Sequence, residues 1–70
     1  MSSSTVAKIT QLSVRSETSF EDAIDTGIAR ATQTLRNVSG AWVKDQKVEI
    51  REGKIVAYQV MLEVTFVLDD

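Results

Sequence analysis

The chain has 70 residues, enough for one small domain, and a net charge of −2 that gives it no basic surface for nucleic acid. It has neither Cys nor His, which excludes disulfides and the common zinc sites. No apolar run approaches the roughly 18 residues of a membrane-spanning helix, so we expect a cytoplasmic protein without nucleic-acid or membrane partners.

The beginning of the chain is polar. Its first five residues, MSSST, lack the layout of a signal peptide, so we expect residues 1–5 to form a disordered tail and residues 6–70 to form a single domain. Residues 6–14 (VAKITQLSV) alternate loosely between apolar and polar side chains, which predicts a strand. The polar residues 15–19 (RSETS) then separate this strand from the next element.

A helix is predicted to follow. Thr18 and Ser19 each stand three residues before an acid, so either hydroxyl can cap its first turn. Gly27 falls on the buried side, which indicates that the helix approaches a sheet closely. Asn37, Ser39 and Gly40 are expected to end the helix, with Asn37 or Gly40 in the left-handed conformation. The apolar stripe consists of Phe20, Ile24, Ile28, Ala31 and Leu35, supported by Ala23 and Val38.

Two further strands are predicted over residues 41–51 and 54–68, joined by a tight turn at Glu52-Gly53. The even-numbered residues from Val56 to Leu68 form an unbroken apolar face on the long last strand. The odd-numbered face is mixed and includes Ile55, Met61 and Val67. The chain is therefore expected to be an α+β protein of β-α-β-β order, with a three-stranded antiparallel sheet packed on one helix. Because one helix covers one face only, we expect further copies of the chain to cover the other face.

The residues offer little for catalysis. There is no matched nucleophile and base and no glycine-rich phosphate loop, so we expect a protein that is not an enzyme. The acidic residues Glu21, Asp22 and Asp25 fit a solvated helix start better than a pair of catalytic carboxylates, and 69–70 is a terminal acidic pair. Asp45 and Glu49 share a strand face and can supply oxygens to Ca²⁺ or Mg²⁺, although exposed strand charges are the more frequent explanation.

Two residues suggest a ligand. Trp42, beside the small residues Gly40 and Ala41, fits either a subunit interface or stacking on a flat aromatic ligand. Gln59 places an amide in the middle of the apolar last strand, on the face away from the helix. An amide offers a donor and an acceptor side by side, which suits the imide edge of a flavin or pyrimidine. It can equally bond another Gln59 across a symmetry axis.

Three segments of the chain resemble the dodecins, small flavin-binding proteins of β-α-β-β fold that assemble as hollow homododecamers. The resemblance is carried by SFEDAIDTGIARATQTLRN (residues 19–37), EGKI (52–55) and AYQVMLEVTFVLD (57–69), which align without gaps. It implies a flavin cofactor (riboflavin, FMN or FAD) held between subunits. In flavin-binding dodecins a Trp shortly after the TLRN-like segment stacks on the isoalloxazine ring, and a Gln of the last strand bonds the ring's polar edge.

Only one of the two family residues, the Gln, has a counterpart at the same position in this sequence. Gln59, following Tyr58, matches the family Gln, but Gly40 stands in the slot of the family Trp and Trp42 comes two residues later. Two residues preserve the strand face but shift the side chain by roughly 6.5 Å. A β-bulge near Gly40 would recover part of that shift. Ala57 and Val67 replace a His and a basic residue frequent in the family, which suggests a different ligand pocket.

We therefore expect a non-catalytic flavin-storage protein in which Trp42, Gly40, Ala41 and Gln59 form the flavin site. The alternative is a dodecin-like structural oligomer that binds coenzyme A or divalent cations, with Asp45 and Glu49 as cation ligands and weak or no flavin binding.

Overall fold

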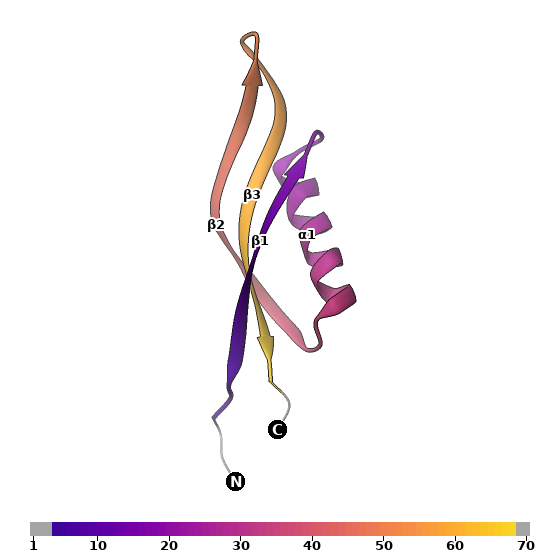
Figure 1. Cartoon of the computed structure of the whole chain (residues 1–70), viewed down its shortest axis with the longest axis vertical. Coiled ribbons are helices and arrows are strands. Elements are labelled where there is room, and N and C mark those ends of the chain that lie inside the picture. Colours follow the sequence, from indigo (N-terminus) through magenta and orange to yellow (C-terminus); the bar gives the residue numbers. More distant parts are fainter. Residues whose placement is uncertain (1–3, 69–70) are drawn as a thin grey trace.

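The structure, a computed structural model, describes residues 4–68 and consists of three strands and one helix (Figure 1). Strand β1 spans Ala7–Ser16, helix α1 Phe20–Thr34, strand β2 Val38–Arg51 and strand β3 Lys54–Val67. This confirms the predicted β-α-β-β order. The start of the predicted N-terminal tail (residues 1–3) and the terminal acidic pair lie outside the described residues. The one helix is too short and too polar to cross a membrane.

Strand β3 lies in the centre of the sheet, between β1 and β2, and pairs antiparallel with both. Its even-numbered residues face α1, and Val60, Leu62 and Val64 are buried there against Ala23 and Ala31 of the helix. The strand with the most continuous apolar face thus forms the middle of the core. The chain is elongated, 59 × 20 × 14 Å. The β2–β3 hairpin extends past the N-terminal end of the helix (Figure 1).

Helix α1 begins at the second of the two predicted caps. The Ser19 hydroxyl accepts a hydrogen bond from the Asp22 backbone N–H at 2.9 Å. The Asp22 carboxylate does not complete a reciprocal capping box. It accepts instead from the hydroxyl of buried Ser16 at 2.7 Å, which ties the helix start to the end of β1. The partly buried stripe residues Phe20, Ile24, Ile28 and Leu35 pack on the core as predicted.

Helix and sheet lie very close together at Gly27. A Cβ built on Gly27 would lie 2.7 Å from Leu62 Cδ1 and 2.8 Å from Val14 Cγ2, closer than real Cβ atoms approach other atoms. The predicted close approach is therefore confirmed. It explains why the chain accepts a residue that costs roughly 1 kcal/mol against Ala in a helix.

The end of the helix differs from the prediction. Helix α1 stops at Thr34, and β2 begins at Val38, three residues earlier than expected, so Gly40 lies inside a strand. Asn37 makes the turn with a positive φ of 61°. Its carbonyl accepts from the Val67 N–H at 3.0 Å and its side-chain amide donates to the Val67 carbonyl at 3.3 Å. Pairing with the end of β3 thus starts directly after Asn37, a contact that the local sequence does not reveal.

The β2–β3 turn is as predicted. Glu52 and Gly53 both have positive φ, 52° and 76°, between the paired residues Arg51 and Lys54. Two positive φ angles in a two-residue loop are the pattern of a type I′ turn, whose twist matches that of the strands.

The sheet face without the helix is less apolar than predicted. Its middle carries hydrogen bonds between polar side chains, from Gln11 to Glu63 at 3.0 Å and from Arg15 to Glu49 at 2.8 Å. The exposed apolar side chains lie nearer the margins and the hairpin tip: Ile9, Trp42, Ile50 and Ile55. The alternation in β3 shows only Glu63 of this set, because Gln11, Arg15 and Glu49 come from β1 and β2.

Candidate functional site on the helix-free face

The strand register assigns the predicted site residues to sheet faces. Odd-numbered residues of β3 point away from α1, and Trp42 is opposite Glu63, Asp45 opposite Met61 and Lys47 opposite Gln59. Trp42, Asp45 and Gln59 therefore share the helix-free face. The face predicted for Gln59 is confirmed.

Trp42 presents its indole to solvent. The residue is 62% exposed, and Lys44 Nζ lies 4.3 Å from the ring centroid in a cation–π contact. Lys44 Nζ also lies 3.9 Å from Glu63 Oε1 on the neighbouring strand. The site thus combines an accessible aromatic surface with an adjacent positive charge.

Register shifts surround Trp42. One falls between Val38 and Gly40 and another between Val43 and Asp45. The first shift sets two residues of β2 against one of β3, as in the bulge considered near Gly40. Gly40, opposite Thr65, is on the same face as Trp42, and a Cβ built on it would meet no atom within 4 Å. Ala41, opposite Val64, belongs to the helix-facing side instead, so the register separates it from Gly40 and Trp42.

A shallow groove of about 360 Å³ runs along the same face. It brings Gln59 and Asp45 together, but Trp42 is not part of it. Sequence reasoning missed Ser13, because only the strand order shows that β1 lies beside β3. It missed Lys47 because the register shifts in β2 decide which residue lies opposite Gln59. The lining residues are Ser13, Asp45, Gln46, Lys47, Gln59, Val60 and Met61.

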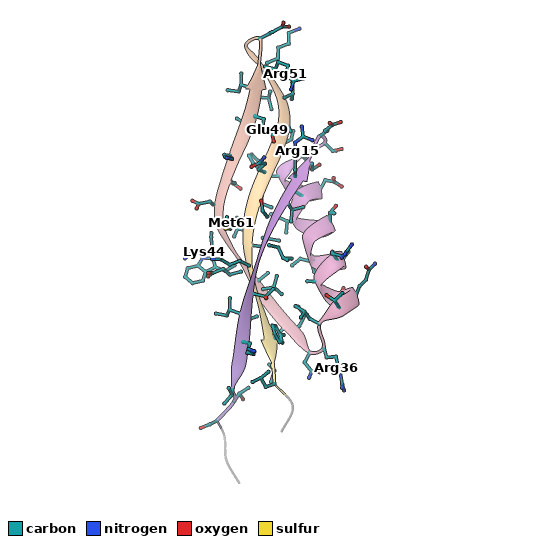
Figure 2. All side chains as sticks on the ribbon, viewed as in Figure 1. Arg15, Arg36, Lys44, Glu49, Arg51 and Met61 are labelled. Carbon is teal, nitrogen blue, oxygen red and sulfur yellow. The ribbon has the colours of Figure 1, made fainter. Side chains whose placement is uncertain are left out.

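Gln59 is held by Glu49, which is in turn bonded to Arg15. Its Nε2 donates to Glu49 Oε2, and Arg15 Nε donates to the same oxygen at 2.8 Å. Figure 2 shows Arg15 and Glu49 close together near the end of β1. The hydrogen bond from Arg15, followed by that from Gln59, lowers the pKa of Glu49, and the same pairing raises the pKa of Arg15. Neither Arg15 nor its link to Gln59 was foreseen from the sequence, since the three residues come from three strands.

Trp42 and Gln59 do not meet within one chain. Their positions on β3, Glu63 and Gln59, are four residues apart, or about 13 Å along a strand. Within one chain the two residues therefore do not form one compact site.

The two candidate cation ligands are also apart. Asp45 and Glu49 share a sheet face as predicted, the helix-free one, but four residues of strand, about 13 Å, separate them. Glu49 is bonded to Arg15 and Gln59. Within residues 4–68, no group of three or more His, Cys, Asp or Glu side chains is placed to hold a metal ion.

The comparisons with known proteins agree with this architecture. The family model described as Dodecin matches residues 6–69. The chain belongs to the dodecin family. A curated dodecin from Thermus thermophilus is 40% identical over 65 residues, covering 93% of this chain and 94% of the relative.

Solved dodecins share the fold over nearly the whole chain. The Streptomyces coelicolor dodecin matches with a TM-score of 0.88 at 26% identity, covering 99% of both chains. The tt0972 protein from T. thermophilus has the same TM-score at 39% identity, covering 96% of this chain and 98% of its own. A calcium dodecin from Mycobacterium tuberculosis, described with a novel calcium-binding site, matches with a TM-score of 0.78 at 31% identity over 91% of both chains. Dodecins are small binding proteins, flavin binding is a general property of the family, and the homologues imply a homododecamer.

Proposed function

We propose that this dodecin is a non-catalytic flavin-binding and storage protein of the cytoplasm, assembled as a hollow homododecamer. The observation that supports this most is the exposed indole of Trp42 on the sheet face that also carries the Gln59 groove. A rigid indole offers a large stacking surface at a small cost in conformational entropy. An amide nearby can orient the polar edge of the same kind of ring.

The residues fit a flavin only across a subunit boundary. Trp42 of one copy would stack on the isoalloxazine ring, and Gln59 of another would bond its imide edge, because one chain holds them about 13 Å apart. Lys44 beside the indole would attract the phosphate of FMN or FAD. A bound flavin supplies light absorption and redox chemistry, and burial between indoles would quench its excited state.

Trp42 takes the part of the family's stacking Trp in this proposal, although Gly40 occupies the family position. The bulge between Val38 and Gly40 adds one residue to β2 relative to β3, which recovers part of the two-residue offset. Gly40 leaves open space on the same face beside the indole. Ala41 contributes backbone only, since its side chain belongs to the other face.

Titration into riboflavin or FMN tests the proposal. We expect the native protein to quench flavin fluorescence with saturation. Trp42→Ala should weaken binding more than about tenfold, equivalent to roughly 1.4 kcal/mol, because it removes the stacking surface. Gln33→Ala, which changes an exposed residue of helix α1 away from the helix-free face, should bind flavin as the native protein does.

A flat titration with the native protein would contradict flavin storage. It would favour the alternative, a dodecin-like oligomer that binds coenzyme A or a divalent cation, and a titration with Ca²⁺ would follow. Quenching that persists unchanged in Trp42→Ala would place the flavin elsewhere on the chain.

A further inference from the structure

The orientation of the Gln59 amide is determined by its neighbours. Gln59 lies on the central strand between two cations, with Arg15 opposite it on β1 and Lys47 opposite it on β2. Without other contacts, either cation would attract the amide oxygen. The side chain instead turns its nitrogen to Glu49 Oε2. A carboxylate only accepts hydrogen bonds, so the amide nitrogen must face it.

Glu49 is itself held in place. Arg15 Nε donates to the oxygen that accepts from Gln59, at 2.8 Å, which occupies Arg15 and neutralises the carboxylate. Glu49 is half-buried, and its pKa is lowered, so it stays ionised through the neutral range. Arg15 of β1 and Gln59 of β3 thus both donate to one carboxylate oxygen of Glu49 on β2.

Fixing the nitrogen also fixes the oxygen. The amide is planar, so Nε2 and Oε1 lie on opposite sides of Cδ. No residue among 4–68 donates a hydrogen bond to Gln59 Oε1, which leaves it available to a ligand, and Gln59 lines the groove. The second hydrogen of Nε2 is also free of the Glu49 bond.

We propose that Arg15 and Glu49 are positioning residues that lock the Gln59 amide with its oxygen toward the ligand, and so select ligands with an N–H donor at their polar edge. This inference rests on the proposed flavin site and deepens it. The preferred edge is an imide, in which an N–H stands between two carbonyls. A ring edge that carries acceptors only would face Oε1 without a donor, which costs the hydrogen bond and leaves an acceptor unpaired.

Two flavins that differ at one atom test the selection. Riboflavin has a hydrogen on N3, and 3-methylriboflavin has a methyl group there. The native protein should bind riboflavin at least about tenfold more tightly, the value of one hydrogen bond of roughly 1.4 kcal/mol. In Glu49→Gln, the neighbour can accept or donate, so the amide is free to turn and the preference should fall to about threefold or less.

Glu17→Gln is the matched control. Glu17 also pairs with Arg15, at 3.4 Å, but no bond joins it to Gln59. The control removes the same charge and should keep the full preference. A purely structural role for Glu49 would weaken both flavins equally and leave their ratio unchanged. If Glu49→Gln does not assemble, Glu49→Met offers the same test, because it also removes the carboxylate that holds the Gln59 nitrogen.

A second measurement does not need a flavin. The ¹⁵N–¹H spectrum of the native protein should show a Gln59 side-chain amide, assigned by its loss in Gln59→Ala, that is displaced by the carboxylate and loses this displacement in Glu49→Gln. Equal binding of the two flavins by the native protein would overturn the inference, and so would a Gln59 amide signal that Glu49→Gln leaves unchanged. If no flavin binds at all, the proposed function fails and the amide signal alone decides the lock.

Discussion

At the scale of single residues, Glu49 connects the stability of the sheet to pH. Its carboxylate accepts hydrogen bonds from Arg15 and Gln59, which lower its pKa, and Lys47 acts in the same direction. A carboxyl whose pKa is lower in the folded state stabilises the fold above its unfolded pKa, about 4.3 for Glu. This contribution is lost as the pH falls through the folded pKa.

We expect the difference in melting temperature between the native protein and Glu49→Gln to depend on pH. At pH 7 the native protein should melt at a higher temperature than Glu49→Gln, because only the native carboxylate makes the charged pair with Arg15. As the pH falls below the ordinary range of Glu, the two melting temperatures should converge. Thermal unfolding followed by circular dichroism at fixed protein concentration measures the gap. A gap that stays constant down to pH 3 would show that the pair does not set stability.

Gly27→Ala should disturb the core, although it adds only one carbon atom. Gly27→Ala gains roughly 1 kcal/mol of helix propensity, but overpacking a tight core costs about 1–3 kcal/mol. The added Cβ would press on Leu62, which is fully buried, and on Val14. We expect a net loss of stability, measured as a lower melting temperature. Gly40→Ala, where the added Cβ meets nothing, should melt at or slightly above the native temperature.

At the scale of elements, the β2–β3 turn offers a stabilising change. Glu52 holds φ at 52°, a conformation that costs an ordinary L-residue roughly 1 kcal/mol or more and that Asn adopts more readily. Glu52→Asn creates the Asn-Gly pair favoured in type I′ turns, so we expect a higher melting temperature. Glu52→Val, which places a β-branched residue at the same φ, should lower it. If Glu52→Val melted at a higher temperature than Glu52→Asn, the turn would be of another type in solution.

The elements with a strong local signal were predictable from the sequence. Helix α1 and strand β3 follow from the periods of their apolar residues, and the Ser19 cap and the Glu52-Gly53 turn follow from side-chain chemistry. The start of β2 was not predictable, because Asn37 ends the loop through contacts with Val67, thirty residues away in the chain. Nor could the sequence show that β1 lies beside β3, which brings Ser13 to the groove and Arg15 to Glu49.

The candidate site was predictable only in part. Trp42 and Gln59 stand out by their residue types, and the structure places Gln59 on the expected face, with Trp42 on the same face. Their separation along the sheet depends on register and bulges, which single residues do not encode. Glu49 was considered as a cation ligand, whereas its contacts with Arg15 and Gln59 give it a different use.

At the scale of the whole molecule, exposed apolar residues call for further copies of the chain. Ile50 is 65% exposed and is paired with Ile55, 53% exposed, near the hairpin tip, beyond the reach of α1. We expect light scattering to give the mass of a homododecamer, many times the 7.7 kDa of one chain. Ile50→Asp should shift the mass toward smaller species, because it would bury a charge in a contact. The mass of a single chain at micromolar concentration would exclude a site built between copies.

Helix α1 is much shorter than strand β3, and this difference in length affects how the protein unfolds and dissociates. A 15-residue helix is about 22 Å long, whereas the 14 residues of β3 extend about 48 Å, so α1 cannot shield more than part of the strand. Strands β1 and β2 pair with β3 along its length, but a cover for the rest of its helix-facing side must come from other copies of the chain. Heating would then separate the shell and unravel its subunits in a single event, so the melting temperature would fall on dilution.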